Sequence, residues 1–154
     1  MALGDYVKTA YANGTTPAIN ATNLNNIEDK VYELDRTVIQ SGVYTPTLTN
    51  VTNVAASAAA PCQYMRVGDV VTVAGRIDID LTSGTTASEL GVTVPIASDF
   101  ALSYQAAGDC IASDGAGVWS ISADVTNNRA SFQTSSVAAT ANTTYYFTFT
   151  YRIL

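Results

Sequence analysis

The chain has 154 residues and a formal net charge of −6 at pH 7, and only 13% of its residues are charged. This length suits one domain, or one small domain with an attached helical segment. The seven Lys and Arg residues stand singly along the chain, whereas proteins that bind the phosphate backbone gather such residues on one surface. We therefore expect no nucleic-acid partner.

Residue types that most site chemistry requires are scarce. The chain has no His, which excludes Ser-His-Asp and Cys-His nucleophile systems and His-based zinc sites. Two cysteines cannot complete a four-ligand zinc site, and no glycine-rich phosphate-binding motif occurs. No stretch reaches the roughly 18 apolar residues of a membrane span, and the N-terminus lacks the pattern of a signal peptide. We expect no enzyme, no cofactor, no metal and no membrane partner.

The first 40 residues divide into two segments. Residues 1–20 show neither the strand nor the helix period, which predicts an irregular arm. From Ala21 to Gln40 the apolar residues recur at spacings of 3, 4, 3 and 4, which predicts a helix with a heptad seam. Ser41-Gly42 is the expected helix stop, so the helical segment covers residues 21–42. The seam residues are Leu24, Ile27, Val31, Leu34 and Val38.

Two interpretations of this helix remain open. The seam is narrow, with polar residues such as Asn26, Lys30 and Glu33 between its members, which favours a coiled coil between copies of the chain. The alternative is a single amphipathic helix that lies on its own β-domain, although such helices have a broader apolar face.

Residues 43–154 form the predicted head domain. Apolar or small residues alternate with polar ones over Val71–Leu81 and over Thr144–Ile153, as in strands with one buried face. Gly68-Asp69 is a hairpin turn signal before the first of these, and Asn127-Asn128 is a second turn. The whole pattern predicts a mainly β fold with an antiparallel β-sandwich head, jelly-roll-like or barrel-like. Further strands are expected at Tyr44–Asn50, Cys62–Val67, Gly91–Pro95, Ala106–Ser113, Val118–Val125 and Ala130–Thr134.

The Ala-rich stretch Ala55–Ala60 ends at Pro61, and we expect a loop or contact segment there rather than a helix. Cys62 and Cys110 stand in predicted strands, so two buried free thiols are the expected state and a disulfide is the alternative. Trp119 alternates with its neighbours as a core residue does; the alternative is a platform on which a sugar stacks.

Only one pair of carboxylates has the spacing of a possible site. Asp78 and Asp80 share the polar face of a predicted strand, beside Arg76. We interpret them as a solvated face; a calcium contact or a glycosidase acid pair are the alternatives. Asp109, Asp114 and Asp124 fall in or near turns, where Asp makes local hydrogen bonds.

Two stretches resemble a known class of protein. One is NGTTPAINATNLNNIE, residues 13–28, which is similar to a segment near the start of tail-fibre and baseplate-associated chains of tailed bacteriophages. The other combines YTPTLTNV, residues 44–51, with QYMRVGDVVTVAG, residues 63–75, and is similar to trimeric C-terminal β-domains of phage fibres and other appendages. The chain thus resembles tailed-bacteriophage virion appendage proteins. It departs from long tail fibres in being very short and without a repetitive shaft.

This resemblance implies a non-enzymatic structural protein, a short homotrimeric fibre on the virion surface, assembled in the host cytoplasm. The arm would attach to other virion proteins of the capsid, portal, neck or baseplate, through Tyr6, Tyr11, Pro17 and Ile19. The helix seam would form the trimer interface and the head would face outward. The alternatives are a module that binds a host-cell glycan or protein receptor, a capsid decoration protein and, remotely, a polysaccharide depolymerase that uses Asp78 and Asp80.

Overall fold

The computed structural model describes residues 21–33, 39–115, 117–137 and 142–154. The chain divides into two compact units, residues 1–40 and residues 41–154. The described part of the first unit is the helix α1 (Ala21–Glu33) and the start of β1. The second unit is a β-domain with one short 3₁₀ helix, η2 (Ser103–Gln105). The fold is mainly β, as the alternating sequence pattern predicted.

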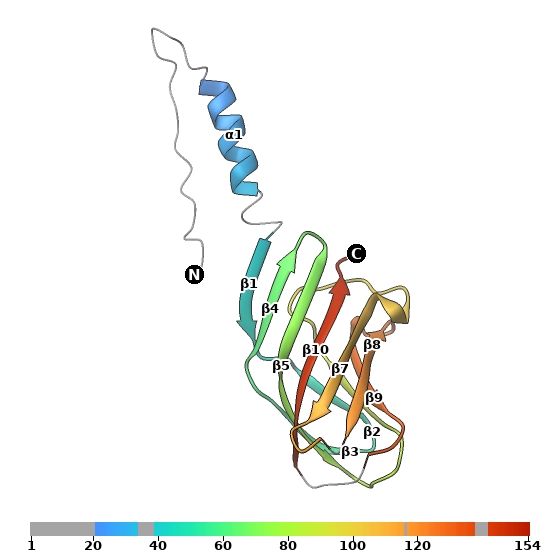
Figure 1. Ribbon diagram of the computed structural model, residues 1–154. Helices are drawn as coiled ribbons and strands as arrows, with labels where there is room; N and C mark the ends of the chain where they lie inside the picture. The colour runs from blue at the N-terminus through green and yellow to red at the C-terminus, as the bar shows by residue number, and fades with distance from the viewer. Residues whose placement is uncertain (1–20, 34–38, 116, 138–141) are drawn as a thin grey trace. The chain divides into compact units, whose positions relative to one another are not determined.

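Ten strands are described (Figure 1). They are β1 (Ile39–Tyr44), β2 (Leu48–Thr52), β3 (Val54–Ala59), β4 (Cys62–Val67), β5 (Val70–Leu81), β6 (Ser88–Val92), β7 (Ala106–Ala112), β8 (Val118–Asp124), β9 (Arg129–Thr134) and β10 (Thr143–Arg152).

These strands join into one sheet rather than two. Its order is β1-β4-β5-β10-β7-β8-β9-β6-β2, and β3 pairs with β5 beyond the end of β4. The sheet curls, so that β2 at its far end comes back toward β3 (Figure 1). There the Ser57 hydroxyl donates a hydrogen bond of 2.6 Å to the side-chain oxygen of Asn50. The head is therefore a curled, half-barrel antiparallel sheet, which agrees with the barrel-like form of the expected head and not with a sandwich of two sheets.

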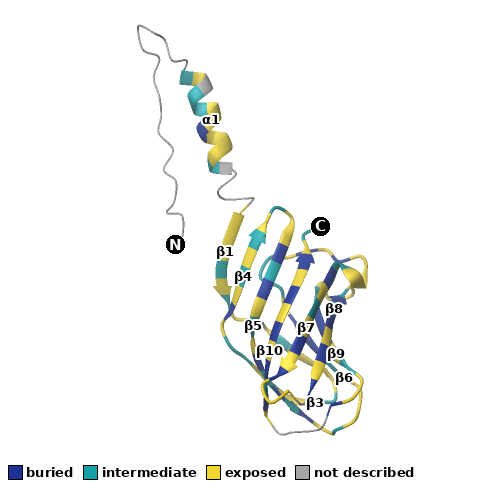
Figure 2. Ribbon diagram, viewed as in Figure 1, coloured by how far each residue is buried: buried dark blue, intermediate teal, exposed yellow. Residues whose placement is uncertain are grey.

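The period-2 pattern predicted the buried faces of the two central strands. Along β5 and β10 buried residues alternate with exposed or half-buried ones, with one interruption in β5 around Gly75 (Figure 2). Because β10 pairs with both β5 and β7, its aromatic face covers the centre of the sheet's inner surface. Phe132 of β9 meets Phe147 and Phe149 edge-on, with ring centroids 5.1 and 6.0 Å apart. Such pairs add about 0.5–1.5 kcal/mol each beyond the area that they bury.

Both cysteines are buried free thiols, as expected. Burial raises the pKa of the Cys110 thiol to about 12, and it also raises the pKa of Cys62. Trp119 is fully buried and meets the ring of Tyr145 edge-on at 5.7 Å. The core interpretation of Trp119 is confirmed, and it is not a platform for a sugar.

Both turn signals are confirmed. Gly68 adopts a positive φ of 61° between β4 and β5, a conformation that glycine takes without steric cost. Asn128 has a φ of 51° between β8 and β9, and Asn is among the few other residues that tolerate it. The Asp124 carboxylate accepts hydrogen bonds of 3.2 Å from the amides of Thr126 and Asn127 and so closes this turn.

Two expectations about segment type are wrong. Ile39 and Gln40, assigned to the helix, begin β1, and Ser41-Gly42 continues this strand instead of stopping a helix. A Cβ on Gly42 would lie 2.8 Å from the Tyr64 ring, so the glycine lets that ring pack against the backbone. Ala55–Ala60, expected as a loop, lies largely in β3, because backbone pairing with β5 can form whatever the side chains are.

Candidate functional site

The predicted seam is only partly described. In α1, Ile27 is 60% exposed and Val31 is 46% exposed, while Leu24 is half-buried. Leu34 and Val38 lie outside the described residues, as do the arm residues Tyr6, Tyr11, Pro17 and Ile19. In the described helix the seam therefore presents two apolar side chains to solvent. Neither α1 nor any other described helix is long and apolar enough to cross a membrane.

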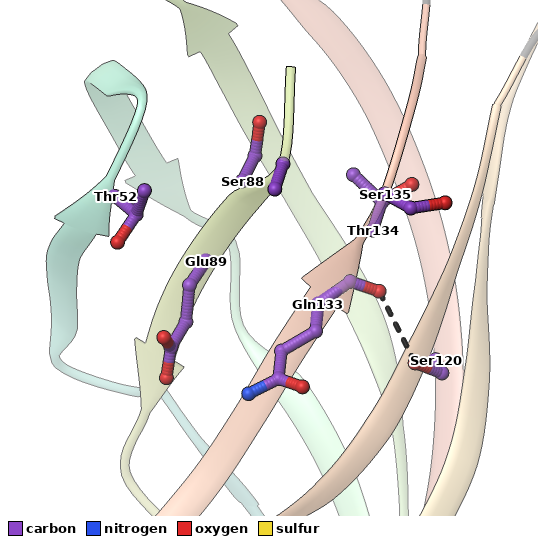
Figure 3. A pocket seen from close by; sticks show the side chains of 8 residues that line it. Thr52, Ser88, Glu89, Ser120, Gln133, Thr134 and Ser135 are labelled. Carbon is purple, nitrogen blue, oxygen red and sulfur yellow. Dashed lines mark hydrogen bonds between the residues drawn. The ribbon is translucent and has the colours of Figure 1, made fainter. Parts of the chain in front are cut away.

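A polar groove lies on the outer face of the head, across four neighbouring strands (Figure 3). Its centre is one cross-strand row in which Thr52 of β2 pairs with Glu89 of β6, Glu89 with Gln133 of β9, and Gln133 with Ser120 of β8. The hollow has a volume of about 440 Å³. The remaining lining residues are Ala87, Ser88, Thr134 and Ser135.

Hydrogen bonds to neighbouring strands hold several of the groove's side chains. Ser131 donates a bond of 2.8 Å to Oε1 of Glu89. Ser120 donates one of 3.2 Å to the backbone carbonyl of Gln133, drawn as a dashed line in Figure 3. Thr134 donates one of 3.1 Å to the carbonyl of Val118. The walls of the groove are thus fixed by the sheet and by side-chain bonds to it.

Other polar groups of the groove have no such partner. Among the described residues, none hydrogen-bonds to the side-chain amide of Gln133, to Oε2 of Glu89 or to the hydroxyls of Thr52 and Ser135. These groups supply both donors and acceptors. They are therefore available to a ligand in the groove.

The charge at the groove is negative. Glu89 is its one charged lining residue in the described chain, and Asp109 of β7 continues the same cross-strand row beyond Ser120. The nearby guanidinium of Arg129 is occupied by Asp124, with Nε 2.8 Å from a carboxylate oxygen. The groove thus lacks a free cation among its described lining residues.

The carboxylate pair predicted from the sequence lies elsewhere: Asp78 and Asp80 line a second hollow together with Ala56, Ser57, Ala58 and Asn142. Asp78 accepts hydrogen bonds from Arg76 at 2.8 Å and from the Thr144 hydroxyl at 2.7 Å. The bonds from Arg76 and then Thr144 lower the pKa of Asp78, whereas a glycosidase acid needs a raised one. The described residues contain no group of three potential metal ligands.

A row of exposed apolar residues crosses the outer face of β8, β7 and β10, beside the groove. Val118 of β8, Ile111 of β7 and Tyr146 of β10 are paired in register, and they are 57%, 50% and 57% exposed. We name these three residues the outer apolar row. Contiguous apolar residues on a sheet face mark a surface suited to contact with another protein.

Sequence analysis found neither the groove nor the outer apolar row. The groove residues come from four strands between positions 52 and 135, and only the strand register brings them together. Glu89 lies in β6 but outside the strand that we expected at Gly91–Pro95, and alternation within a strand does not show which strands are neighbours.

No protein-family model matches the chain, and no curated protein matches it in sequence. Among solved structures, the chain is similar to the reovirus attachment protein sigma1, crystallised in complex with alpha-2,3-sialyllactose. The identity is 15%, the TM-score is 0.46, and the match covers 77% of this chain and 68% of that one. Similarity at this level assigns no family to the chain.

Proposed function

We propose that the chain is a non-enzymatic virion structural protein, a short homotrimeric fibre anchored through residues 1–20 and displaying its β-head at the particle surface. The observation that carries this proposal is the exposure of Ile27 and Val31 on α1. Full burial of such a side chain contributes about 1.5–3 kcal/mol, so a helix that leaves two of them in water gains by meeting other copies. The heptad spacing favours a coiled coil between copies, and the phage resemblance implies that the copies are three.

The outer apolar row offers a second surface for contact between copies. Because it lies on the head, it would hold the heads together even if the helices separated. The two surfaces are far apart in the sequence and can be changed independently.

Static light scattering on the full chain tests the proposal. A homotrimer of the 16.1 kDa chain is expected. Replacing Ile27 and Val31 by Asp should dissociate it, since three copies would then place like charges in one seam. Replacing Ile111 and Tyr146 by Ser is the matched change on the outer apolar row.

Each outcome has a definite meaning. A parent chain that is monomeric at all concentrations contradicts the trimer. A trimer that the helix variant leaves intact and the head variant dissociates moves the interface to the head. Dissociation by the helix variant alone supports the proposed seam.

A second candidate function is a receptor-binding or carbohydrate-binding module, and the polar groove favours it. Binding of the full chain to purified virus particles and, separately, to host cells would distinguish the two candidate functions. Binding to particles alone would leave the groove without a receptor role.

A further inference from the structure

We infer that the polar groove defined by Thr52, Glu89, Ser120 and Gln133 is a binding subsite for an uncharged sugar. The inference deepens the carbohydrate-binding candidate and rests on the head being exposed. It does not depend on the trimer, because all of the groove's residues belong to one head.

The first argument is the inventory of free hydrogen-bonding groups. The Gln133 amide can donate and accept, Oε2 of Glu89 accepts, and the hydroxyls of Thr52 and Ser135 do both. Sugar hydroxyls likewise donate and accept, and neighbouring hydroxyls on a ring are met best by planar amide and carboxylate groups. An apolar ligand would leave these groups unpaired, which costs free energy.

The second argument is shape. Neighbouring strands are about 4.8 Å apart, so the row from Thr52 to Ser120 spans about 14 Å across the sheet. The hollow of about 440 Å³ along this row lies within the usual size range of small-molecule sites. A short oligosaccharide that lies across the strands fits both dimensions.

The third argument is rigidity. All four residues of the row sit on paired strands, and Glu89 is held by Ser131. A ligand would therefore meet a fixed backbone and a held Glu89 and would have to order chiefly the Gln133 side chain, at a cost of about 0.5–1.5 kcal/mol.

Charge decides which sugars the groove accepts. Glu89 lines it, Asp109 stands next in the same row, and no Lys or Arg lines it in the described chain. A carboxylate or sulfate about 5 Å from Glu89 would be repelled enough to weaken binding about tenfold or more. Glu89 is also the groove's one lining carboxylate among the described residues, so the arrangement suits binding rather than hydrolysis by an acid pair.

The experiment uses the full chain and a fixed panel of methyl glycosides: glucose, galactose, mannose, N-acetylglucosamine and rhamnose. Each is titrated to tens of millimolar while the backbone amide signals of positions 89, 120 and 133, which every variant retains, are followed by NMR. Glucuronic and galacturonic acid glycosides are the acidic counterparts of two of these sugars. Light scattering on the same samples records the oligomeric state, so failure of the trimer and failure of the groove are told apart.

Three variants make the test specific. Gln133→Ala removes the free amide and should weaken binding about tenfold, since two hydrogen bonds are lost. Gln63→Ala is the matched control, because Gln63 is exposed on β4 and pairs with Ala74, away from the groove. Glu89→Gln keeps the acceptor for Ser131 but removes the charge, and it should reduce the preference for the uncharged sugar.

Binding of at least one neutral sugar, weakened about tenfold in Gln133→Ala and unchanged in Gln63→Ala, would support the inference. A silent panel would overturn it, as would binding that Gln133→Ala leaves unchanged. Equal or tighter binding of an acidic counterpart by the parent chain would also overturn it, because it contradicts the charge argument. Trp119 fluorescence checks that each variant is folded.

Discussion

A substitution at Gly75 tests whether the core is packed as the structure shows. Gly75 of β5 lies between Cys62 of β4 and Phe147 of β10. A Cβ added there would collide with the Cys62 sulfur, and it would lie 2.8 Å from Cys62 Cβ and 2.9 Å from Phe147 Cζ. Gly75 has no positive φ, so the effect of an alanine there is a matter of space rather than of backbone strain.

The expected size of the effect follows from two opposing terms. Overpacking a core costs about 1–3 kcal/mol. Replacing Gly by Ala at a compatible backbone position restores about 0.4–1 kcal/mol by restricting the unfolded chain. Gly75→Ala should therefore lower the free energy of unfolding by about 1–2 kcal/mol.

A double-mutant cycle identifies the cause. Cys62→Ala alone should cost about 1–2 kcal/mol through the space that it leaves. In the double variant the new methyl group occupies the space of the missing sulfur, so the combined loss should be smaller than the sum by about 1 kcal/mol or more.

Urea unfolding followed by Trp119 fluorescence measures the free energy of unfolding of the parent chain, the two single variants and the double variant. All four are measured at one protein concentration, because association between copies shifts the apparent stability. Trp119 is the chain's single Trp and is fully buried, so its emission reports loss of the core. Additive losses, within about 0.5 kcal/mol, would refute the reasoning. So would a Gly75→Ala chain as stable as the parent.

Two further predictions concern titratable groups. Burial alone would raise the pKa of Asp124, but hydrogen bonds from Asn127 and Arg129 outweigh burial and lower that pKa. The ionised Asp124 therefore stabilises the folded chain above the unfolded-state pKa of about 3.9, and this stabilisation is lost as the pH falls through the lower folded-state pKa. Asp124→Asn should thus cost about 1–3 kcal/mol at pH 7, and its deficit in urea unfolding should shrink at low pH; a deficit that is constant with pH would contradict the ion pair. Because both thiols are buried with raised pKa values, a disulfide-exchange reagent should react slowly with the native chain and with two thiols per chain in denaturant. Rapid native labelling, or no free thiol after unfolding, would count against the buried thiols.

Local patterns in the sequence were enough to predict much of the head's secondary structure. Alternation over Val71–Leu81 and Thr144–Ile153 predicted the buried faces of β5 and β10, because side chains on a strand point to opposite faces in turn. Turn residues such as Gly68 marked the hairpins, because few residues tolerate a positive φ. These are properties of neighbouring residues and need no knowledge of the fold.

Pairing between distant strands set the rest. Ile39 and Gln40 continue a helical pattern in the sequence but join the sheet as part of β1. The Ala-rich segment likewise becomes β3. In both cases backbone hydrogen bonds to a neighbouring strand outweigh a weak local preference. The groove exists because register places Thr52, Glu89, Gln133 and Ser120 in one row. The order of strands in a sheet is set by which hydrophobic faces meet across long loops, and periodicity within a strand carries no information about its neighbour.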